Sequence, residues 1–563
     1  MDQEKYSNLT LAGQTANDKG GVHLTNTGIS PRGERSFSIH KQKNMILRYF
    51  DTRYNWQWWL PENGNQQIPS FRVVEASDLI IDHISSGWSA YGLIITDARG
   101  TNRGETGKVT VQRSLMHENV RTPLSSQGKH NHNVGMLLGL RGHNNSLNDW
   151  NKVTSFSIHK NAFIGVSHRL PNTAGGDAAS FSVVNNFIYG FTGDGDMRVS
   201  RIGGNSWNDF INNSYQEAKY SVQFATNNLL GFQFGSFMTN EPGMPDTKPN
   251  FYINGNIFID EQENLLDITS VIENDPRKMT FVYATSPTAT THNRGSNLNE
   301  QDHRLVLRSK SIQNTIKELE SDPIDSQLHE WPVHARTSVS ILPASEVKSN
   351  VLSNVGGNVR FHDDGSTYID DPVDQNYINW AINNEGPEFN TQTLNDGGIG
   401  DMGGENTEYG EFRFKYPEYA SRSVNLDDYD SDRDGMPNAW ELEHGLNPDL
   451  PENNAIRHNR NWFFGQYLVR NVAGYTNLEM YLADIGGDFH MLAKTEGVPI
   501  NNRKDDLVSV AMPKAVNPGT TAIADVKYSA RKQRQIKCFF RKNSSPWTLV
   551  AMSKVTVKAG AGT

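Results

Sequence analysis

Three aspartates alternate along a short segment near the C-terminal end of the 563-residue chain. The segment DSDRDGMPNAWE, residues 430–441, matches the pattern D-x-D-x-D-G-x5-E at every defined position. Carboxylates this close repel each other unless a cation neutralises them, and Ca2+ takes about six to eight oxygen ligands. We therefore predict a structural calcium site; a solvated acidic loop without metal is the alternative. Its expected ligands are the side chains of Asp430, Asp432, Asp434 and Glu441, the backbone carbonyl of Met436, and Asn438 directly or through a water.

A single helix is expected after this loop. Pro437 suits a first helical turn, and the segment AWELEHGL predicts a helix that ends at Gly445. With one helix rather than two, the loop resembles the EF-hand-like calcium loops of dockerins and extracellular repeats. That resemblance implies a structural ion, which should hold the helical segment 474–485 against the region before it and raise thermal stability.

The N-terminal part of the chain shows little helical periodicity. Before residue 300, short segments rich in Val, Ile, Phe and Tyr alternate between apolar and polar residues and are separated by Gly, Asn and Asp, which predicts β-strands. Four segments place an asparagine five residues after an aromatic residue: Asn161, Asn186, Asn212 and Asn256. Their spacings of 25, 26 and 44 residues indicate a solenoid. In a parallel β-helix such residues stack into a ladder; a β-sandwich is the alternative.

The pattern changes along the chain and predicts its domain organisation. We expect an all-β chain with a right-handed parallel β-helix over residues 1–265, a loop and helix region over 266–425, a calcium-loop and helix segment over 426–490, and a small β-sandwich-like module over 505–563. Helices are expected over 312–319 and 346–355. The last module should hold four short strands, DVKYSA, QIKCFF, WTLVAM and KVTVKA.

Composition excludes several classes of protein. The net charge of -10 and the sequence pI of about 5.9 argue against nucleic acid and anionic membrane surfaces as partners. No apolar run is long enough for membrane insertion. The single cysteine, Cys538, cannot form an intrachain disulfide. The N-terminus shows no secretory signal, so we expect a trimmed leader or another export route, and an extracellular or virion-associated protein.

Several segments resemble, in order, the parallel β-helix pectate lyases of the first polysaccharide lyase family. They are NLTLAGQTA at Asn8, NMILRYF at Asn44, IIDHISSGWS at Ile80, MHENVR at Met116, HNVGMLLG at His132 and SHRLP at Ser167. The resemblance runs over roughly residues 8–485 and implies a pectin-lyase-like solenoid that cleaves an acidic, uronate-containing polysaccharide by β-elimination. Because the chain begins inside the family pattern, the resemblance also implies an N-terminal capping partner or an oligomer.

The resemblance implies particular catalytic residues. Arg169 matches the family's arginine base and His132 its histidine. Glu118 and Arg121 match its glutamate and arginine one coil earlier. The base would remove the C5 proton while a cation holds the uronate carboxylate, since positive charge must stabilise the carbanion-like state.

The sequence departs from the family at the expected catalytic calcium site. Ala90, Tyr91 and Gly92 stand where acidic residues usually follow Trp-Ser, so this site is either missing or rebuilt from Asp97 and Glu118. Asn172 and Ala174 replace two further arginines, which implies a weaker grip on uronate carboxylates or a less charged substrate.

Two other functions fit the same fold. An Asn-rich β-helix also suits a glycan-binding stalk of the virus-tail or adhesin type, which holds sugars without cleaving them. A glycoside hydrolase would need two carboxylates at a defined separation, for which Asp177, Asp194 and Asp196 are candidates, although turn formation explains these aspartates more simply.

Overall fold

The computed structural model divides into two compact units, Met1–Tyr429 and Asp430–Thr563, here called unit 1 and unit 2. The finer division into four parts stays a prediction. The structure describes residues 7–13, 21–24, 37–53, 69–89, 92–97, 104–118, 134–139, 152–166, 169–176, 178–191, 198–204, 206–218, 233–239, 250–260, 263–268, 281–284, 306–307, 339, 341–357, 359–361, 367–369, 371–386, 405–406, 412–413, 426–456, 461–464, 467–470, 474–485, 507–511, 525–530, 534–541, 549–557 and 560–562.

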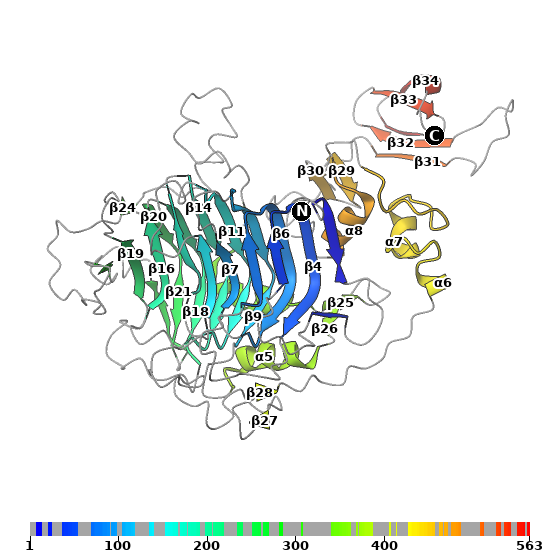
Figure 1. Cartoon of the computed structure of the whole chain (residues 1–563). Coiled ribbons are helices and arrows are strands. Elements are labelled where there is room, and N and C mark those ends of the chain that lie inside the picture. Colours follow the sequence, from blue (N-terminus) through cyan, green and yellow to red (C-terminus); the bar gives the residue numbers. More distant parts are fainter. Residues whose placement is uncertain are drawn as a thin grey trace. The chain divides into compact units, whose positions relative to one another are not determined.

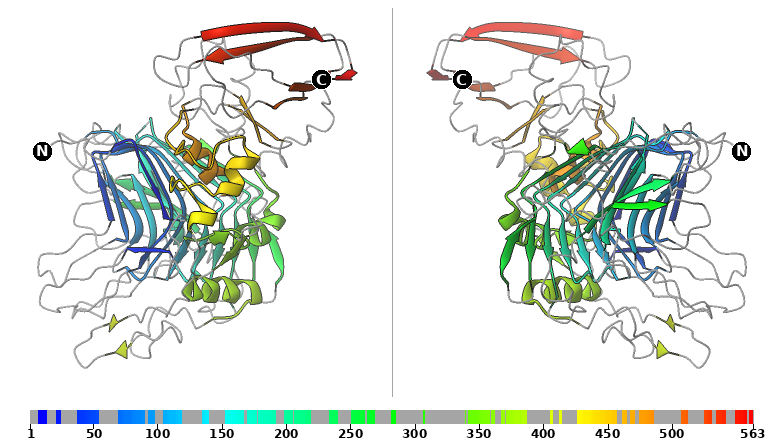
Figure 2. Two further views of the ribbon diagram at one scale, coloured as in Figure 1. Left: turned by 90° about the vertical axis from the view of Figure 1, so that its right-hand side faces the viewer. Right: turned by 90° about the vertical axis from the view of Figure 1, so that its left-hand side faces the viewer.

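Unit 1 is a parallel β-helix whose coils contribute strands to three faces (Figures 1 and 2). The first face holds β1 (Leu9–Ala12), β8 (Gly107–Gln112), β11 (Ser155–His159), β14 (Ser180–Val184), β17 (Trp207–Ile211), β20 (Asn250–Asn254) and β24 (Val306–Leu307). The second holds β2 (Val22–Leu24), β9 (Leu115–His117), β12 (Ala162–Ile164), β15 (Phe187–Tyr189), β18 (Ser214–Gln216), β21 (Ile257–Ile259) and β22 (Leu265–Asp267). The third holds β3 (Phe37–His40), β5 (Phe71–Val74), β7 (Gly92–Asp97), β10 (Val134–Gly139), β13 (Asn172–Gly175), β16 (Arg198–Gly204), β19 (Gln233–Thr239) and β23 (Phe281–Ala284).

Two long strands, β4 (Lys43–Arg53) and β6 (Ser77–Gly87), run through both the first and the second face. The described strand pairs of the three faces are parallel except β21 with β22. The predicted parallel β-helix is therefore confirmed, and a sandwich is excluded for unit 1.

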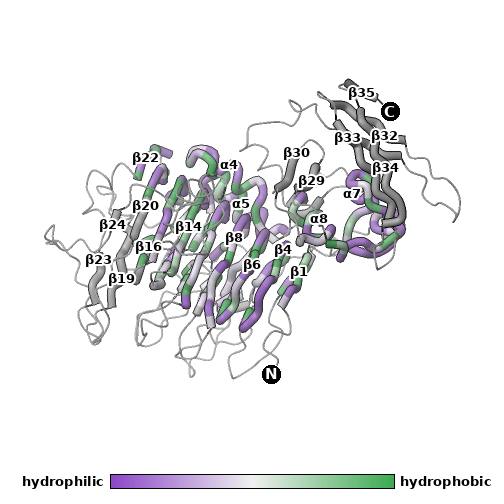
Figure 3. The backbone as a smooth tube through the Cα atoms, turned by 90° about the horizontal axis from the view of Figure 1, so that it is seen from above, coloured by the Kyte–Doolittle hydropathy of each residue, from purple (hydrophilic) through white to green (hydrophobic). Residues whose placement is uncertain are grey.

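The interior of the β-helix is apolar because side chains alternate between inside and outside along each strand. Leu47, Ile81, Val111, Ile158 and Val183 occupy matching positions on successive strands, and each is at most 1% exposed. Burial of each such side chain contributes about 1.5–3 kcal/mol. Figure 3 shows both hydrophobic and hydrophilic residues along strands such as β4 and β6.

An asparagine ladder runs along the turn between the first and second faces. Its members Asn161, Asn186, Asn213 and Asn256 are fully buried. The side-chain oxygen of each later member accepts hydrogen bonds from the backbone N–H and the Nδ2 of the member before it, at 2.8–3.1 Å. The ladder satisfies polar groups that stacking would otherwise bury without partners. The predicted ladder is confirmed at three positions, whereas Asn212 is wrong.

The error at Asn212 comes from a shift of one residue. Asn208, rather than Trp207, lies beside Phe181 in the neighbouring coil. Asn212 therefore falls on the turn position before the ladder, with a left-handed φ of 48°. Its Nδ2 donates a hydrogen bond to the carbonyl of Leu342 at 2.8 Å, so it points away from the ladder.

A helical cover, defined as residues 341–357 and 371–386, packs on the second face. It contains α4 (Ala344–Leu352) and α5 (Pro372–Asn383). Its apolar side chains meet a strip of the β-helix formed by Trp88, Leu115, Ala162, Ile164, Phe187 and Tyr189. α4 confirms the helix predicted over 346–355, two residues earlier in the chain; the one predicted over 312–319 lies outside the described residues.

Short elements complete unit 1. They are the hairpin β25 (Val359–Phe361) with β26 (Thr367–Ile369), the hairpin β27 (Glu405–Asn406) with β28 (Phe412–Arg413), and α6 (Leu426–Tyr429).

Unit 2 begins with the acidic loop and ends in small antiparallel sheets. It contains α7 (Asn438–Glu443), the hairpin β29 (Asn461–Phe464) with β30 (Tyr467–Arg470), α8 (Asn477–Ile485), the sheet of β31 (Leu507–Ala511), β32 (Asp525–Ala530) and β35 (Gly560–Gly562), and the pair β33 (Arg534–Arg541) with β34 (Leu549–Val557). The described residues of WTLVAM and KVTVKA, 549–552 and 554–557, belong to the single strand β34, so the expectation of two separate strands is wrong. The described helices of the whole chain include none with the length and apolarity to span a membrane.

Candidate functional site

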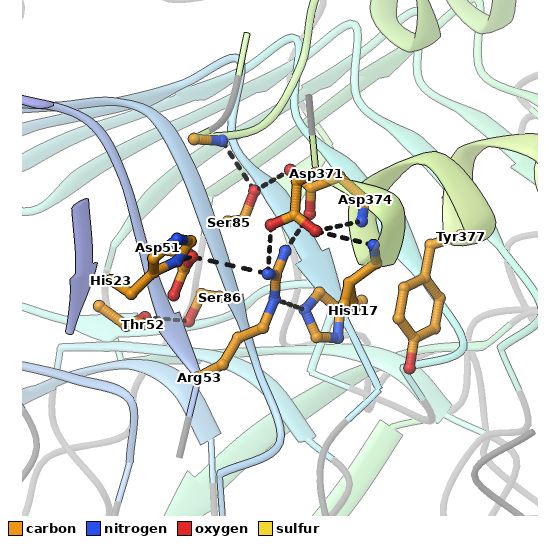
Figure 4. A network of polar contacts seen from close by, with 12 residues as sticks. His23, Asp51, Thr52, Arg53, Ser85, Ser86, His117, Asp371, Asp374 and Tyr377 are labelled. Carbon is orange, nitrogen blue, oxygen red and sulfur yellow. Dashed lines mark hydrogen bonds and ion pairs between the residues drawn. The ribbon is translucent and has the colours of Figure 1, made fainter. Parts of the chain in front are cut away.

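A charged cluster is buried where α5 begins. Arg53, at the end of β4, is fully buried, and each of its three guanidinium nitrogens donates a hydrogen bond (Figure 4). Its Nε donates to Nε2 of His117 at 3.0 Å, and its two terminal nitrogens donate to the carboxylates of Asp371 and Asp374. This Arg53 cluster fastens the helical cover to the β-helix.

The local sequence of α5 explains why both carboxylates reach Arg53. Asp371 is the N-cap: its Oδ1 accepts hydrogen bonds from the N–H of Val373 at 2.7 Å and of Asp374 at 3.3 Å. Pro372 follows at the first helical position, where its missing N–H has no cost. The carboxylates of the first turn therefore lie at the positive end of the helix dipole, and Ser85 donates a further hydrogen bond to Asp374.

Burial controls the protonation of this cluster. Burial raises the pKa of Asp374 to about 7, with the charges of Asp371 and Asp51 adding to the effect and Arg53 opposing it. Burial, and then the neighbouring Arg53, hold the pKa of His117 well below its ordinary value. His117 is therefore a neutral acceptor, and the enclosed cluster is suited to holding structure rather than to meeting a polymer.

Glu118 lies in the same enclosed region. It is 3% exposed, and its Oε2 accepts a hydrogen bond from the hydroxyl of Tyr377 on α5 at 3.3 Å. Its backbone carbonyl accepts from the N–H of Trp88 at 2.9 Å. The structure thus places Glu118 under the helical cover, in an environment that the sequence did not predict.

Arg169 lies at the start of the third face, just before β13. It has a left-handed φ of 61°, its carbonyl accepts a hydrogen bond from the N–H of Met136 at 2.8 Å, and a cis Leu170–Pro171 bond follows it. The predicted neighbours His132 and Arg121 lie outside the described residues. So do Ala90, Tyr91, Asp177, Asp194 and Asp196, named in the alternatives above.

Strand register separates Arg169 from Asp97. Asn172 pairs with Leu137, and Leu137 pairs with Ile95. The carbonyl of Arg169 accepts from the N–H of Met136, one residue before that level, whereas Asp97 lies two residues beyond it on a strand two coils away. Asp97 ends β7 on the third face, whereas Glu118 lies under the cover of the second. The structure therefore does not bring Glu118 to Asp97 or to Arg169.

The acidic loop of unit 2 is closed on itself by backbone donors. The carboxylate oxygens of Asp430 accept hydrogen bonds from the N–H of Asp434 at 3.1 Å and of Gly435 at 2.9 Å. Gly435 has φ 94°, which permits the sharp turn. One carboxylate oxygen from each of Asp430, Asp432 and Asp434 lies within 4.8 Å of the others. These oxygens are close enough to share one cation.

Glu441, on α7, is the last residue of the predicted calcium loop. Its side chain is fully buried, and neither carboxylate oxygen has a hydrogen-bond partner among the described residues. Burial, and then the charges of Asp434, Asp432, Asp430 and Glu452, raise its pKa to about 8. A buried carboxylate among other carboxylates fits a bound cation.

Asn438 is occupied within the loop. Its Oδ1 accepts hydrogen bonds from the N–H of Ser431 at 2.9 Å and from its hydroxyl at 3.2 Å. The carboxylate of Asp434 also accepts hydrogen bonds. Its Oδ2 accepts from the N–H of Glu452 and from the N–H of Asn453, both at 2.9 Å. The sequence did not predict this link between the loop and the segment after α7.

The loop region is packed against α8. The indole Nε1 of Trp440 donates to Asp484 at 2.9 Å, and Nδ2 of Asn477 donates to the carbonyl of Glu452 at 2.9 Å. The expected contact between the segment 474–485 and the region before it is therefore present within unit 2.

Comparison with solved structures finds pectate lyases at low sequence identity. No protein-family model matches the sequence, and none of the curated proteins searched is similar to it. A thermostable pectate lyase structure has 14% identity and a TM-score of 0.33, with 58% of this chain and 64% of that chain covered, so the chain spans less than two thirds of it. A pectate lyase bound to a hexasaccharide has 11% identity, a TM-score of 0.31, and 60% and 66% covered. A pectate lyase from Paenibacillus sp. 0602 has 12% identity, a TM-score of 0.34, and 64% and 77% covered.

Proposed function

We propose that this chain is an extracellular polysaccharide lyase that cleaves an acidic, uronate-containing polysaccharide by β-elimination, with Arg169 as the base. The observation that supports it is the place of Arg169: a partly exposed arginine at the entry to β13, on a parallel β-helix, with its backbone fixed by Met136. The order of the pectate-lyase-like segments supports the same reading.

The chemistry requires positive charge beside the reacting carbon. A proton next to a carboxylate is weakly acidic, so a cation must hold that carboxylate while the base removes the C5 proton and the C4 oxygen leaves. His132 and Arg121 are proposed to assist Arg169. Glu118 is assigned to holding α5 instead, because Tyr377 covers it. Since the helical cover closes the second face, the polymer is proposed to lie along the third.

The test is an assay of cleavage. The protein is incubated with pectate, alginate and other uronate polymers, with and without Ca2+, and the ultraviolet absorbance of the unsaturated product is followed. Arg169→Ala should abolish product formation, while Lys43→Ala, which removes an exposed cation at the start of β4 on the first face, should not. Unchanged turnover in Arg169→Ala would remove Arg169 from the mechanism. Polymer binding without cleavage across the panel would favour the glycan-binding stalk.

We also propose that residues 430–441 bind a structural Ca2+. The buried Glu441 supports this most directly, because its two carboxylate oxygens have no hydrogen-bond partner in the described structure and the charges of the three aspartates help to raise its pKa. Asp430, Asp432, Asp434, Glu441 and the carbonyl of Met436 would supply oxygens. Asn438 would act through a water, because Ser431 already uses its Oδ1.

Thermal unfolding of the whole chain in calcium and in chelator tests this site. Binding to the folded state should stabilise unit 2 by about 2.7 kcal/mol when free Ca2+ is 100 times Kd. Glu441→Gln should lose that gain and Glu443→Gln, an exposed glutamate of the same helix, should keep it. A melting temperature that is the same in calcium and in chelator would contradict the proposal.

A further inference from the structure

The Arg53 cluster holds more negative than positive charge. Asp51, Asp371 and Asp374 are each at most 1% exposed at their side chains, and Arg53 is the arginine that contacts all three. His117 accepts a hydrogen bond from Arg53 and so adds no positive charge. Asp51 and Asp371 alone outnumber the single guanidinium, and uncompensated buried charge is strongly unfavourable.

One carboxylate oxygen is left over in this cluster. Oδ1 of Asp51 is buried and has no hydrogen-bond partner among the described residues. The other oxygen, Oδ2, contacts Nδ1 of His23 on β2 and lies 3.6 Å from Arg53. An unpartnered oxygen on a fully buried carboxylate indicates that a further ligand belongs beside Asp51.

Three donors from separate elements converge at this point. The three ligand atoms come from β2, β4 and the N-cap of α5. They belong to His23, Asp51 and Asp371, one atom each, and they lie within 4.8 Å of one another. Figure 4 shows His23 and Asp51 side by side, with Asp371 beyond the guanidinium of Arg53. The side chain of His23 is 19% exposed, which gives an ion a route from solvent.

We propose that His23, Asp51 and Asp371 bind a divalent transition metal ion of the Zn2+ or Mn2+ class. An imidazole nitrogen with carboxylate oxygens suits these ions, whereas Ca2+ prefers oxygen ligands alone. The positive charge of the ion would offset the excess of carboxylates over the guanidinium. Arg53 holds Oδ2 of Asp371, and the N–H groups of Val373 and Asp374 hold its Oδ1, so this ligand is already oriented.

This ion would join three distant parts of unit 1. It would tie the N-terminal coil, through His23, to β4 and to the start of the helical cover. A link between residues 23 and 371 closes a very long loop, and such links stabilise the folded chain most in the loop-entropy description. The site is independent of the proposed lyase chemistry and of the calcium loop of unit 2.

Metal counting on the whole chain tests the proposal. The protein is stripped with chelator, equilibrated with excess Ca2+ to fill residues 430–441, titrated with Zn2+, and the bound zinc is measured after gel filtration. We expect wild type to bind one more equivalent of Zn2+ than His23→Ala. His40→Ala removes a more exposed histidine, 55% exposed beside Glu75, and should bind zinc as wild type does. Equal zinc in wild type and His23→Ala would overturn the site.

A second variant and a second readout guard against misfolding. Asp51→Asn keeps the shape of the side chain, and circular dichroism reports whether each variant is folded. A folded Asp51→Asn should lose the same equivalent of zinc and the visible absorption that Co2+ gives in wild type. Glu441→Gln should retain both signals. A Co2+ spectrum that is unchanged in folded Asp51→Asn would also overturn the proposal.

Discussion

Nε of Arg53 donates a hydrogen bond to Nε2 of His117 at 3.0 Å, and both side chains are completely buried. His117 must therefore carry its own proton on Nδ1 and remain neutral, in agreement with its lowered pKa. The contact joins β4 to β9, and the same guanidinium continues to Asp371 and Asp374 on α5. One side chain thus connects two coils of the β-helix with the helical cover.

We predict that Arg53→Met destabilises unit 1 by about 3–5 kcal/mol, because it leaves buried carboxylates without their partner. Arg53→Lys should recover part of the loss, since an ammonium group restores the charge but not the three-way geometry. Urea unfolding measures both. Arg72→Met, at a half-buried position of β5, is the control and should change stability by less than about 1 kcal/mol. Equal losses at Arg53 and Arg72 would contradict this role.

Gly87→Ala should disturb the same contact through sterics. A Cβ at Gly87 would lie 2.0 Å from Cε1 of His117. The imidazole cannot withdraw, because it stacks on Tyr377 at 4.4 Å and meets Trp88 edge-on at 5.6 Å. We expect a loss of about 1–3 kcal/mol, the usual range for overpacking.

The matched control for Gly87→Ala is Gly445→Ala, which has nothing within 4 Å of its added Cβ and suffers only from its φ of 72°. The double variant Gly87→Ala with His117→Ala should cost less than the sum of the single changes, because the clash is gone. Additive losses would show that His117 is not the obstacle.

Asn213→Ala should destabilise unit 1 far more than Asn212→Gly. Asn213 accepts two hydrogen bonds from Asn186 and donates to Val183 at 2.9 Å and to Asn256 at 2.8 Å, all in the buried ladder. Its removal leaves buried groups unsatisfied, at about 1–3 kcal/mol for each. Asn212→Gly loses one side-chain hydrogen bond at a half-buried position, and glycine adopts the left-handed φ of this residue without strain. If Asn212→Gly lowered the melting temperature more than Asn213→Ala does, the ladder position would be Asn212 instead.

His159 should make stability depend on pH in the acid range. Burial, and then the charges of Lys160 and Arg113, lower its pKa to about 3, against the ordinary 6.5 expected for the unfolded chain. The unfolded state therefore binds one more proton between these values, so this contribution is complete above about pH 6.5 and falls as pH drops toward 3.

We expect the stability difference between wild type and His159→Gln to change by up to about 1.4 kcal/mol per pH unit within that window. Ser157→Ala is the control: it removes the contact between the Ser157 hydroxyl and His159 Nδ1 at 3.1 Å without removing the titrating group. Ser157→Ala should change the free energy of unfolding but keep its dependence on pH. Parallel pH profiles for wild type and His159→Gln would exclude His159 as the source.

The sequence by itself determined the repetitive parts of this protein. Alternating apolar residues and asparagines at solenoid spacing predicted a parallel β-helix, because each coil must place the same kinds of side chain in the core and in the turn. The acidic loop was equally local. Its aspartates and its glycine lie close together in the sequence, within residues 430–435, so their convergence follows from sequence distance alone.

The tertiary structure decided which distant segments contact each other. The shift that replaced Asn212 by Asn213 depends on how β17 pairs with β14, which a spacing rule cannot foresee. Glu118 fits a catalytic pattern in the sequence, yet Tyr377 of α5 encloses it. The Arg53 cluster joins residues more than 300 positions apart, with Arg53 and Asp371 separated by 318. Such a meeting is fixed by the packing of α5 on the second face, and no local pattern encodes it.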